Sequence, residues 1–144
     1  MAEAYEKYKI KDYKYWTMFL HVNQYPYIWR CYAWAKRENA DLTTDMTKEE
    51  RDELFDEVIP SWSNCVKGLF SNDRINVSSL GNTSNHLHWH MIPRYFAPRE
   101  FDWIKFLDAN PNANYAPYEK KELNEDILQK IKQALKSKLV TYNL

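Results

Sequence analysis

Three histidines alternate with apolar residues over positions 86–92, and this alternation is the strongest constraint on how the chain can fold. Successive side chains of a β-strand point to opposite faces, so His86, His88 and His90 would share one face. The interleaved apolar residues would point to the other face, into a hydrophobic core: Leu87, Trp89 and Met91. The pattern predicts a strand that carries a row of titratable side chains on a rigid, apolar-backed support.

Two longer segments have the apolar spacing of helices. A capping box begins at Thr47, with Glu50 three residues later. The apolar residues that follow recur at helical intervals and form one stripe: Leu54, Phe55, Val58, Ile59, Trp62, Val66 and Leu69. Pro60 interrupts this stripe, so the long helix is expected to kink or to split in two. A closing amphipathic helix is predicted over 118–140, with apolar residues at Leu123, Ile127, Leu128, Ile131, Leu135 and Leu139.

The remaining regular segments predict strands. Stretches rich in aromatic and β-branched residues are expected to form strands over 15–22, 28–35 and 75–80, after a short helix near residues 3–9. Because strands and helices are segregated along the chain, the order favours an α+β domain with an antiparallel sheet over alternating βαβ units.

The part of the chain after the histidine strand is expected to be irregular. Pro93 and Pro98 should end regular pairing, and residues 101–117 read as an exposed excursion. The 144 residues suit a single domain, with residues 1–14 as an N-terminal extension.

The composition excludes several classes of protein. Lys and Arg together number 20, as do Asp and Glu, so the chain lacks the basic excess of a protein that coats nucleic acid. Gly68 and Gly81 are the only glycines, which excludes a glycine-rich phosphate loop. Cys31 and Cys65 make neither a disulfide framework nor a zinc motif, and no apolar run is long enough to span a membrane. We therefore expect a reduced, cytoplasmic protein that binds neither nucleic acid nor membranes.

Three interpretations of the histidine row compete. A solvated polar row gives no reason for three histidines at period two. A metal site would need His21 or a carboxylate as a further ligand, because His86 and His90 would lie about 13 Å apart on a strand. A neutral imidazole is a good nucleophile near pH 7, and flanking histidines can donate to phosphate oxygens and to a departing group. We favour nucleophilic catalysis and expect no metal ligand set.

The residues from His86 to Ile92 match the histidine triad motif, His-φ-His-φ-His-φ-φ with φ hydrophobic, at every position. The chain therefore resembles the histidine triad family, and Pro93-Arg94-Tyr95 is similar to the continuation in its dinucleoside polyphosphate hydrolase branch. The resemblance covers roughly residues 15–96. It implies a sheet of about five antiparallel strands with flanking helices, and a homodimer formed through the long helix and the adjoining strand.

The resemblance also implies a reaction. His88 would attack the α-phosphorus of a dinucleoside polyphosphate or a nucleoside phosphoramidate and form a nucleotidyl-histidine. His90 would contact the phosphate oxygens and the leaving group, while His86 would support His88 through hydrogen bonding. The chain would then be a nucleotide hydrolase or transferase whose partner is a small nucleotide, with no cofactor beyond Mg²⁺ carried by a polyphosphate substrate.

Four further residues are candidates for nucleotide binding. By resemblance, Asn23 would bind the ribose hydroxyls, and Asn82 and Thr83 would reach the phosphates. Arg94 shares the parity of the histidines, and ligand contact and surface ion pairing are equal alternatives for it. Arg30 stands where the family often has glycine, and Asn82 is one methylene shorter than the usual glutamine. These departures keep open an alternative function, a nucleotide-binding protein of the same fold with little or no turnover.

Overall fold

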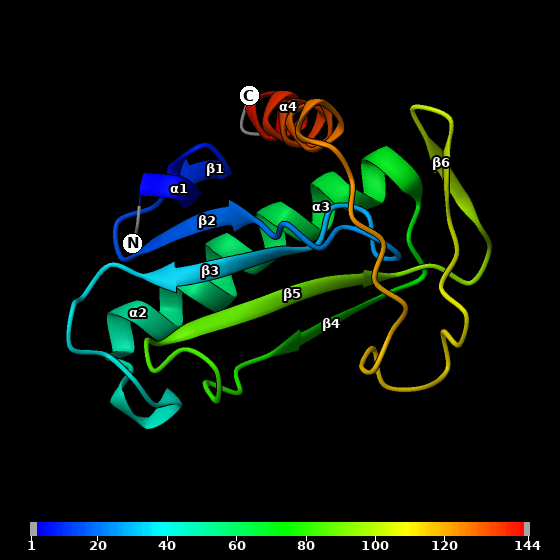
Figure 1. Cartoon of the computed structure of the whole chain (residues 1–144). Coiled ribbons are helices and arrows are strands. Elements are labelled where there is room, and N and C mark those ends of the chain that lie inside the picture. The colour runs from blue at the N-terminus through cyan, green and yellow to red at the C-terminus, as the bar shows by residue number, and fades with distance from the viewer. Residues whose placement is uncertain (1–2, 143–144) are drawn as a thin grey trace.

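The computed structural model describes residues 3–142, and its centre is a five-stranded antiparallel sheet (Figure 1). The strands lie in the order β1-β2-β3-β5-β4, with bounds Lys9–Asp12 (β1), Trp16–Leu20 (β2), Cys31–Ala35 (β3), His88–Arg94 (β5) and Arg74–Ser78 (β4). β3 and β5 pair in the middle of the sheet, where Trp34 lies opposite His88 and Tyr32 lies opposite His90. The predicted α+β class with an antiparallel sheet is confirmed.

The long helical segment predicted by the apolar stripe covers one face of this sheet (Figure 1). After a short 3₁₀ helix over Thr43–Asp45, α2 (Lys48–Glu53) begins at the predicted capping box, in which the Thr47 hydroxyl accepts from the Glu50 N–H at 3.1 Å. A π-helical turn over Leu54–Val58 then leads into α3 (Ile59–Phe70). Pro60 lies in the first turn of α3, where a missing N–H costs little. The expected interruption is therefore confirmed, and it takes the form of a π turn.

The C-terminal helix α4 (Glu125–Tyr142) packs against α3 and β1. It begins later than predicted, because the Asn124 side chain accepts from the Ile127 N–H at 2.9 Å and caps the helix there. Its buried residues are those of the predicted apolar face: Leu128, Ile131, Leu135 and Leu139.

The predicted strand over 28–35 is shorter than expected, because β3 begins at Cys31. The preceding residues form a loop that is held by the fully buried side chain of Gln24. This amide donates to the carbonyl oxygens of His21 (2.7 Å) and Arg30 (2.8 Å) and accepts from the Trp29 N–H (2.6 Å). Trp29 itself has a left-handed backbone, with φ of 70°. A side chain thus supplies the hydrogen bonds that strand pairing was expected to provide.

Two other boundaries differ from the predictions. The N-terminal helix α1 spans only Glu3–Glu6, and β1 follows as an edge strand that the sequence analysis missed. The alternating lysines of β1 are typical of a solvent-exposed polar segment, so this strand was not predicted. Charged residues are also typical of edge strands, because they prevent unwanted pairing with other chains. Pro93 does not end β5, since it lies opposite Ile75 of β4. The last residue pair between β5 and β3 is Met91 with Cys31, and Pro93 lies beyond it. At this position β5 has no partner on the β3 side, so the missing N–H of proline is tolerated.

Residues 101–117 are not a freely exposed excursion. Arg99–Phe101 (β6) and Ile104–Phe106 (β7) form a hairpin, and Phe106 is buried against Tyr25, with ring centroids 5.8 Å apart. The following segment folds back, so that Tyr115 and Tyr118 contact the loop before β3.

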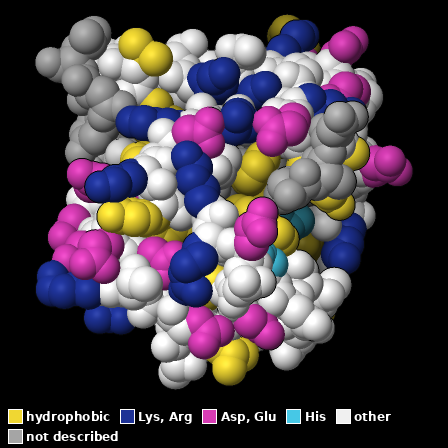
Figure 2. Space-filling view, turned by 90° about the vertical axis from the view of Figure 1, so that its left-hand side faces the viewer, with side chains coloured by type: hydrophobic (Ala, Val, Ile, Leu, Met, Phe, Trp, Pro, Cys, Tyr) yellow, Lys and Arg dark blue, Asp and Glu magenta, His cyan; other side chains and the backbone are white. Residues whose placement is uncertain are grey.

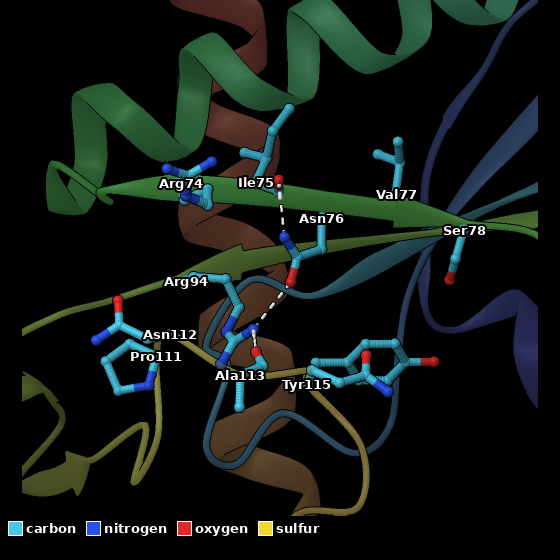
Figure 3. Close-up of a pocket in the computed structure, with 11 residues that line it drawn as sticks. Arg74, Ile75, Asn76, Val77, Ser78, Arg94, Pro111, Asn112, Ala113 and Tyr115 are labelled. Atoms are coloured by element: carbon cyan, nitrogen blue, oxygen red, sulfur yellow. Dashed lines mark hydrogen bonds between the residues drawn. The ribbon is translucent and has the colours of Figure 1, made fainter.

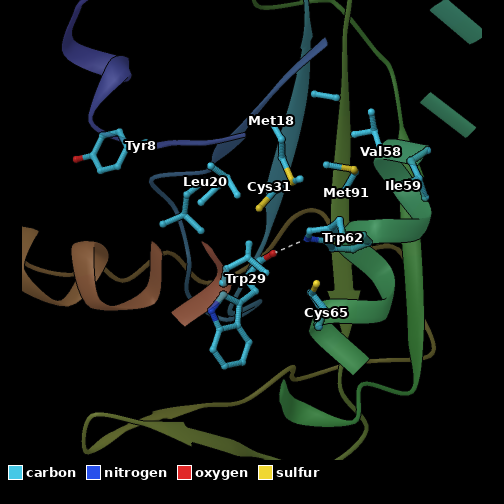
Figure 4. Packing of buried hydrophobic residues seen from close by; sticks show 14 of the residues in the cluster. Tyr8, Met18, Leu20, Trp29, Cys31, Val58, Ile59, Trp62, Cys65 and Met91 are labelled. Atoms are coloured by element: carbon cyan, nitrogen blue, oxygen red, sulfur yellow. Dashed lines mark hydrogen bonds between the residues drawn. The ribbon is translucent and has the colours of Figure 1, made fainter. Parts of the chain in front are cut away.

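The core lies between the sheet and α3, and it contains Met91 of β5 (Figure 4). Leu87, which directly precedes β5, is also part of this core. Two buried indoles tie this core to the loop before β3. The Trp62 N–H donates to the Trp29 carbonyl at 3.0 Å, and the Trp29 ring N–H donates to Ile131 of α4 at 3.1 Å. Within residues 3–142, no helix is both long enough and apolar enough to cross a membrane.

Candidate active site

His88 is the first residue of β5, and one hydrogen bond orients its ring. Its Nδ1 lies 2.6 Å from the main-chain oxygen of His86. A carbonyl oxygen can only accept, so Nδ1 is the donor, and in a neutral imidazole of this tautomer Nε2 has the free lone pair. The ring stacks on Trp34 at a centroid distance of 5.5 Å, and the residue is only 9% exposed. The hydrogen bond and the stacking thus fix the orientation of the His88 ring, with Nδ1 toward the main chain.

His86 lies before β5, so it does not continue the strand as predicted. Its Nε2 donates to the main-chain oxygen of Ala35 at 2.6 Å, and its ring stacks on Trp34 at 4.3 Å with an interplanar angle of 15°. The group that accepts the hydrogen bond from His88 is therefore the main-chain oxygen of His86, not its imidazole. The imidazole of His86 positions that carbonyl by anchoring it to the end of β3.

His90 lies next to His88, with ring centroids 5.0 Å apart and ring planes at 81°. Burial lowers the pKa of His90 to about 4, and the positive charge of Arg30 acts in the same direction. Its Nδ1 is buried and finds no hydrogen-bond partner within the described part of the chain. At neutral pH this ring is an uncharged side chain with an N–H to donate.

His21 completes the cluster, with its ring centroid 5.8 Å from that of His90. Its Nδ1 accepts from the Asn23 N–H at 3.0 Å, so the proton is on Nε2. Burial lowers the pKa of His21 to about 2, and the charge of Arg30 is the second cause. Sequence reasoning considered His21 only as a metal ligand. His21 lies one residue beyond β2, on the same face of the sheet as Tyr32 and His90. This proximity depends on how the strands pair, so the sequence of one segment does not predict it.

Three of these four histidines line one pocket of about 630 Å³ on the sheet face opposite α3. His21, His88 and His90 lie in it together with Arg30 and Lys120. In Figure 2, histidine atoms (cyan) are visible within a recess of the surface. An open, mixed polar and aromatic pocket with neutral imidazoles and two cationic side chains suits an anionic, partly aromatic ligand.

The structure brings only some of the predicted nucleotide-binding residues into this pocket. Asn23 and Thr83 line it, as expected. Asn82 is exposed and is not among the lining residues, whereas Ser84 is. Tyr118 also lines the pocket, although it is far from the histidine motif in sequence and only the fold-back of residues 107–118 brings it there.

Arg94 lies elsewhere, beside a second pocket of about 660 Å³ between β4 and residues 111–115 (Figure 3). It is 2% exposed and forms a buried ion pair with Asp108 at 2.6 Å, whereas the two expected alternatives were ligand contact and an ion pair on the surface. Its guanidinium also donates to Asn76 (2.9 Å) and to the main-chain oxygens of Asn110 (2.9 Å) and Ala113 (2.7 Å). These bonds occupy its donors and attach residues 108–113 to the sheet.

Within residues 3–142, no three side chains of His, Cys, Asp or Glu are arranged to hold a metal ion. Each of the clustered histidines uses its ring atoms differently. His86 and His88 bond to main-chain oxygens, while His21 accepts from a main-chain N–H. The cluster thus offers ring nitrogens that donate hydrogen bonds and ring nitrogens that accept them.

The chain has the histidine triad fold. It is similar to the histidine triad protein blr8122 from Bradyrhizobium japonicum, with 18% identity, 96% of each chain covered and a TM-score of 0.71. A Zn-bound histidine triad family protein from Mycobacterium smegmatis matches with 15% identity, 94% and 85% coverage and a TM-score of 0.62. A diadenosine triphosphate hydrolase from Plasmodium falciparum matches with 11% identity, 96% and 78% coverage and a TM-score of 0.60. No protein-family model matches the chain, and no curated protein matches its sequence.

Proposed function

We propose that the protein is a nucleotide hydrolase or transferase of the dinucleoside polyphosphate hydrolase type, in which His88 attacks the α-phosphorus of a nucleotide substrate. The observation that carries this proposal is the 2.6 Å hydrogen bond from His88 Nδ1 to the His86 carbonyl. It fixes the tautomer whose Nε2 lone pair is free, and the ring of His90 lies beside it to donate a proton or hydrogen bond. The fold shared with a diadenosine triphosphate hydrolase supports the same reaction class.

The reaction has two balanced steps. In the first step Nε2 of His88 forms a bond to phosphorus, the bond from phosphorus to the leaving group breaks, and the leaving group takes a proton. In the second step water displaces the histidine and releases a nucleoside monophosphate. His90 is neutral in the free protein, and the negative charge of a bound substrate favours its protonated form, which can donate to the leaving group.

Charge on the phosphoryl oxygens needs donors that are already in place. Thr83 and Ser84 line the same pocket as the histidines, and their hydroxyl groups are candidates for this role. Asn23 lies at the other end of the cluster, beside His21, where it can reach ribose hydroxyls. Asn82 would have to turn inward to reach a phosphate.

The direct test is release of nucleoside monophosphate from a panel of dinucleoside polyphosphates and nucleoside phosphoramidates. An alkaline quench should trap a nucleotide on the peptide that contains His88, because a phosphorus–nitrogen bond withstands alkali better than acid. His88→Asn should abolish the adduct and lower turnover by several orders of magnitude. His90→Asn should be milder on substrates with good leaving groups. Label on another residue, or full activity of His88→Asn, would contradict the mechanism.

A second candidate function is nucleotide binding with little or no turnover. The exposed position of Asn82 favours it, because one expected phosphate contact is absent from the pocket. In that case the protein would bind nucleotides with measurable affinity, and wild type and His88→Asn would show the same negligible release of monophosphate.

We also propose that the protein is a cytoplasmic homodimer. β4 is an edge strand of the sheet, so its outer backbone groups are available for pairing with a second copy. Cys31 and Cys65 are both buried free thiols, which suits a reducing compartment. Sedimentation of the purified protein tests the dimer, and a monomer at micromolar concentration would contradict it.

A further inference from the structure

Arg30 is a buried cation in the loop before β3. It is 4% exposed and precedes β3 in the loop held by Gln24. Its Nη1 donates to the Tyr118 hydroxyl at 2.7 Å, and its guanidinium carbon lies 5.5 Å and 5.4 Å from the ring centres of Tyr115 and Tyr118. The fold-back of residues 107–118 thus places two aromatic rings against this guanidinium.

The charge of Arg30 has no anionic partner in the described structure. No Asp or Glu side chain among the described residues forms an ion pair with it, and its Nε is buried without a hydrogen-bond partner there. Arg94 provides an internal comparison, since it is equally buried but has Asp108 at 2.6 Å. Burying a charge without a counter-charge is strongly unfavourable, and proteins normally avoid it unless a ligand supplies the missing charge.

Arg30 also lines the same pocket as His88 and His90. Its positive charge also contributes to the lowered pKa of both His21 and His90. Arg30 and these histidines therefore form parts of the wall of one pocket.

Strand register gives the distance between Arg30 and the attacking histidine. Trp34 pairs with His88 and Tyr32 with His90, and Arg30 lies two residues further along the same line. Arg30 is therefore four residues from Trp34, the partner of His88. Two residues of a strand span about 6.6 Å, so the backbone of Arg30 lies about 13 Å along the sheet from that of His88. Two anionic groups of one substrate can therefore lie in this pocket, one beside His88 and one beside Arg30.

We propose that Arg30 binds a second anionic group of the substrate, a phosphate or carboxylate separate from the phosphate that His88 attacks. This inference rests on the proposed function for the identity of the attacked group. The buried, unpaired guanidinium and its place in the pocket do not depend on turnover. The chain would then select substrates that carry two anionic groups along the sheet face, and disfavour those with one phosphate.

The first test is calorimetric titration with inorganic pyrophosphate, which needs no chemistry. Arg30→Met should weaken binding about tenfold to hundredfold, as expected for the loss of a charge-assisted hydrogen bond. Arg30→Lys should retain part of the affinity. Arg51→Met is the matched control, because Arg51 is exposed, lies on α2 and does not line the pocket. It removes the same formal charge and should bind pyrophosphate as the wild type does.

The second test compares two substrates in each variant. The ratio of kcat/KM for a dinucleoside polyphosphate to kcat/KM for a nucleoside phosphoramidate should fall about tenfold or more in Arg30→Met and stay unchanged in Arg51→Met. If no variant turns over either substrate but pyrophosphate binding still depends on Arg30, the proposed function fails and the anion site stands. If turnover occurs with an unchanged ratio and unchanged pyrophosphate affinity, the inference about Arg30 fails and the function stands.

A purely structural role for Arg30 would have a different signature. It would lower the melting temperature of Arg30→Met while leaving the pyrophosphate affinity of the folded fraction intact, and this result would overturn the inference. Should Arg30→Met fail to fold, Arg30→Lys and Tyr118→Phe carry the test. Tyr118→Phe removes the hydroxyl that orients the guanidinium and keeps the charge, so it should weaken pyrophosphate binding less than loss of the charge does.

Discussion

Acid should destabilise this protein well above the pH at which carboxylates titrate, because two of its partly buried histidines have a lowered pKa. Burial lowers the pKa of His21 to about 2 and that of His90 to about 4. In the unfolded chain both return to about 6.5. The unfolded state therefore binds more protons than the folded state below pH 6.5. The contribution of the two histidines to the free energy of unfolding is fully present above that pH, and it is lost as the pH falls toward the folded pKa values.

The size of the effect follows from these values. Each histidine lowers the free energy of unfolding by about 2 kcal/mol between pH 7.5 and pH 5, so the pair removes about 4 kcal/mol. This is a large part of the total for a domain of this size, which is on the order of 5–15 kcal/mol. Urea unfolding at several pH values between 7.5 and 5, followed by fluorescence of the buried tryptophans, measures it directly.

Variants assign the loss to the two rings. His21→Asn keeps an acceptor for the Asn23 N–H, and His90→Asn keeps a polar side chain in the pocket, but neither can take up a proton. Each should reduce the pH dependence by about half, to about 2 kcal/mol over the same interval, and the double variant should nearly abolish it. The same slope in wild type and double variant would refute the idea that these histidines are buried in neutral form.

Three further outcomes follow from the structure. His86→Ala should reduce kcat far less than His88→Asn does, because the main chain of residue 86 accepts the His88 hydrogen bond; equal losses would show that the imidazole is itself required. Arg94→Met leaves Asp108 buried without its partner and should lower the free energy of unfolding by about 3–5 kcal/mol in urea, whereas a loss of nucleotide affinity at unchanged stability would point to ligand contact. The purified protein should contain far less than one zinc per chain and keep its activity in chelator, and stoichiometric zinc whose removal abolishes turnover would contradict the nucleophilic mechanism.

Local sequence patterns determined the parts of the fold that depend on periodicity and capping. The alternation at 86–92 specified a half-buried strand, with Leu87 and Met91 in the core. The capping box at Thr47 and the apolar stripe specified the long helix, and Pro60 marked its interruption. These signals suffice because each one is a relation between residues that are close in the chain, and it holds wherever the element is placed.

Tertiary structure alone decided which residues surround the histidines. His21, Arg30 and Tyr118 come from separate segments, and strand pairing and the fold-back of residues 107–118 bring them to one pocket. It also decided that Arg94 is a buried anchor and that residues 28–30 hydrogen-bond to Gln24. A local sequence pattern predicts the face of a strand or helix on which a side chain lies. The hydrogen-bond partner of that side chain, and how far it is removed from water, depend on segments that are distant in the sequence. The proposed nucleophile could therefore be predicted from the motif, whereas the cations that line its pocket could not.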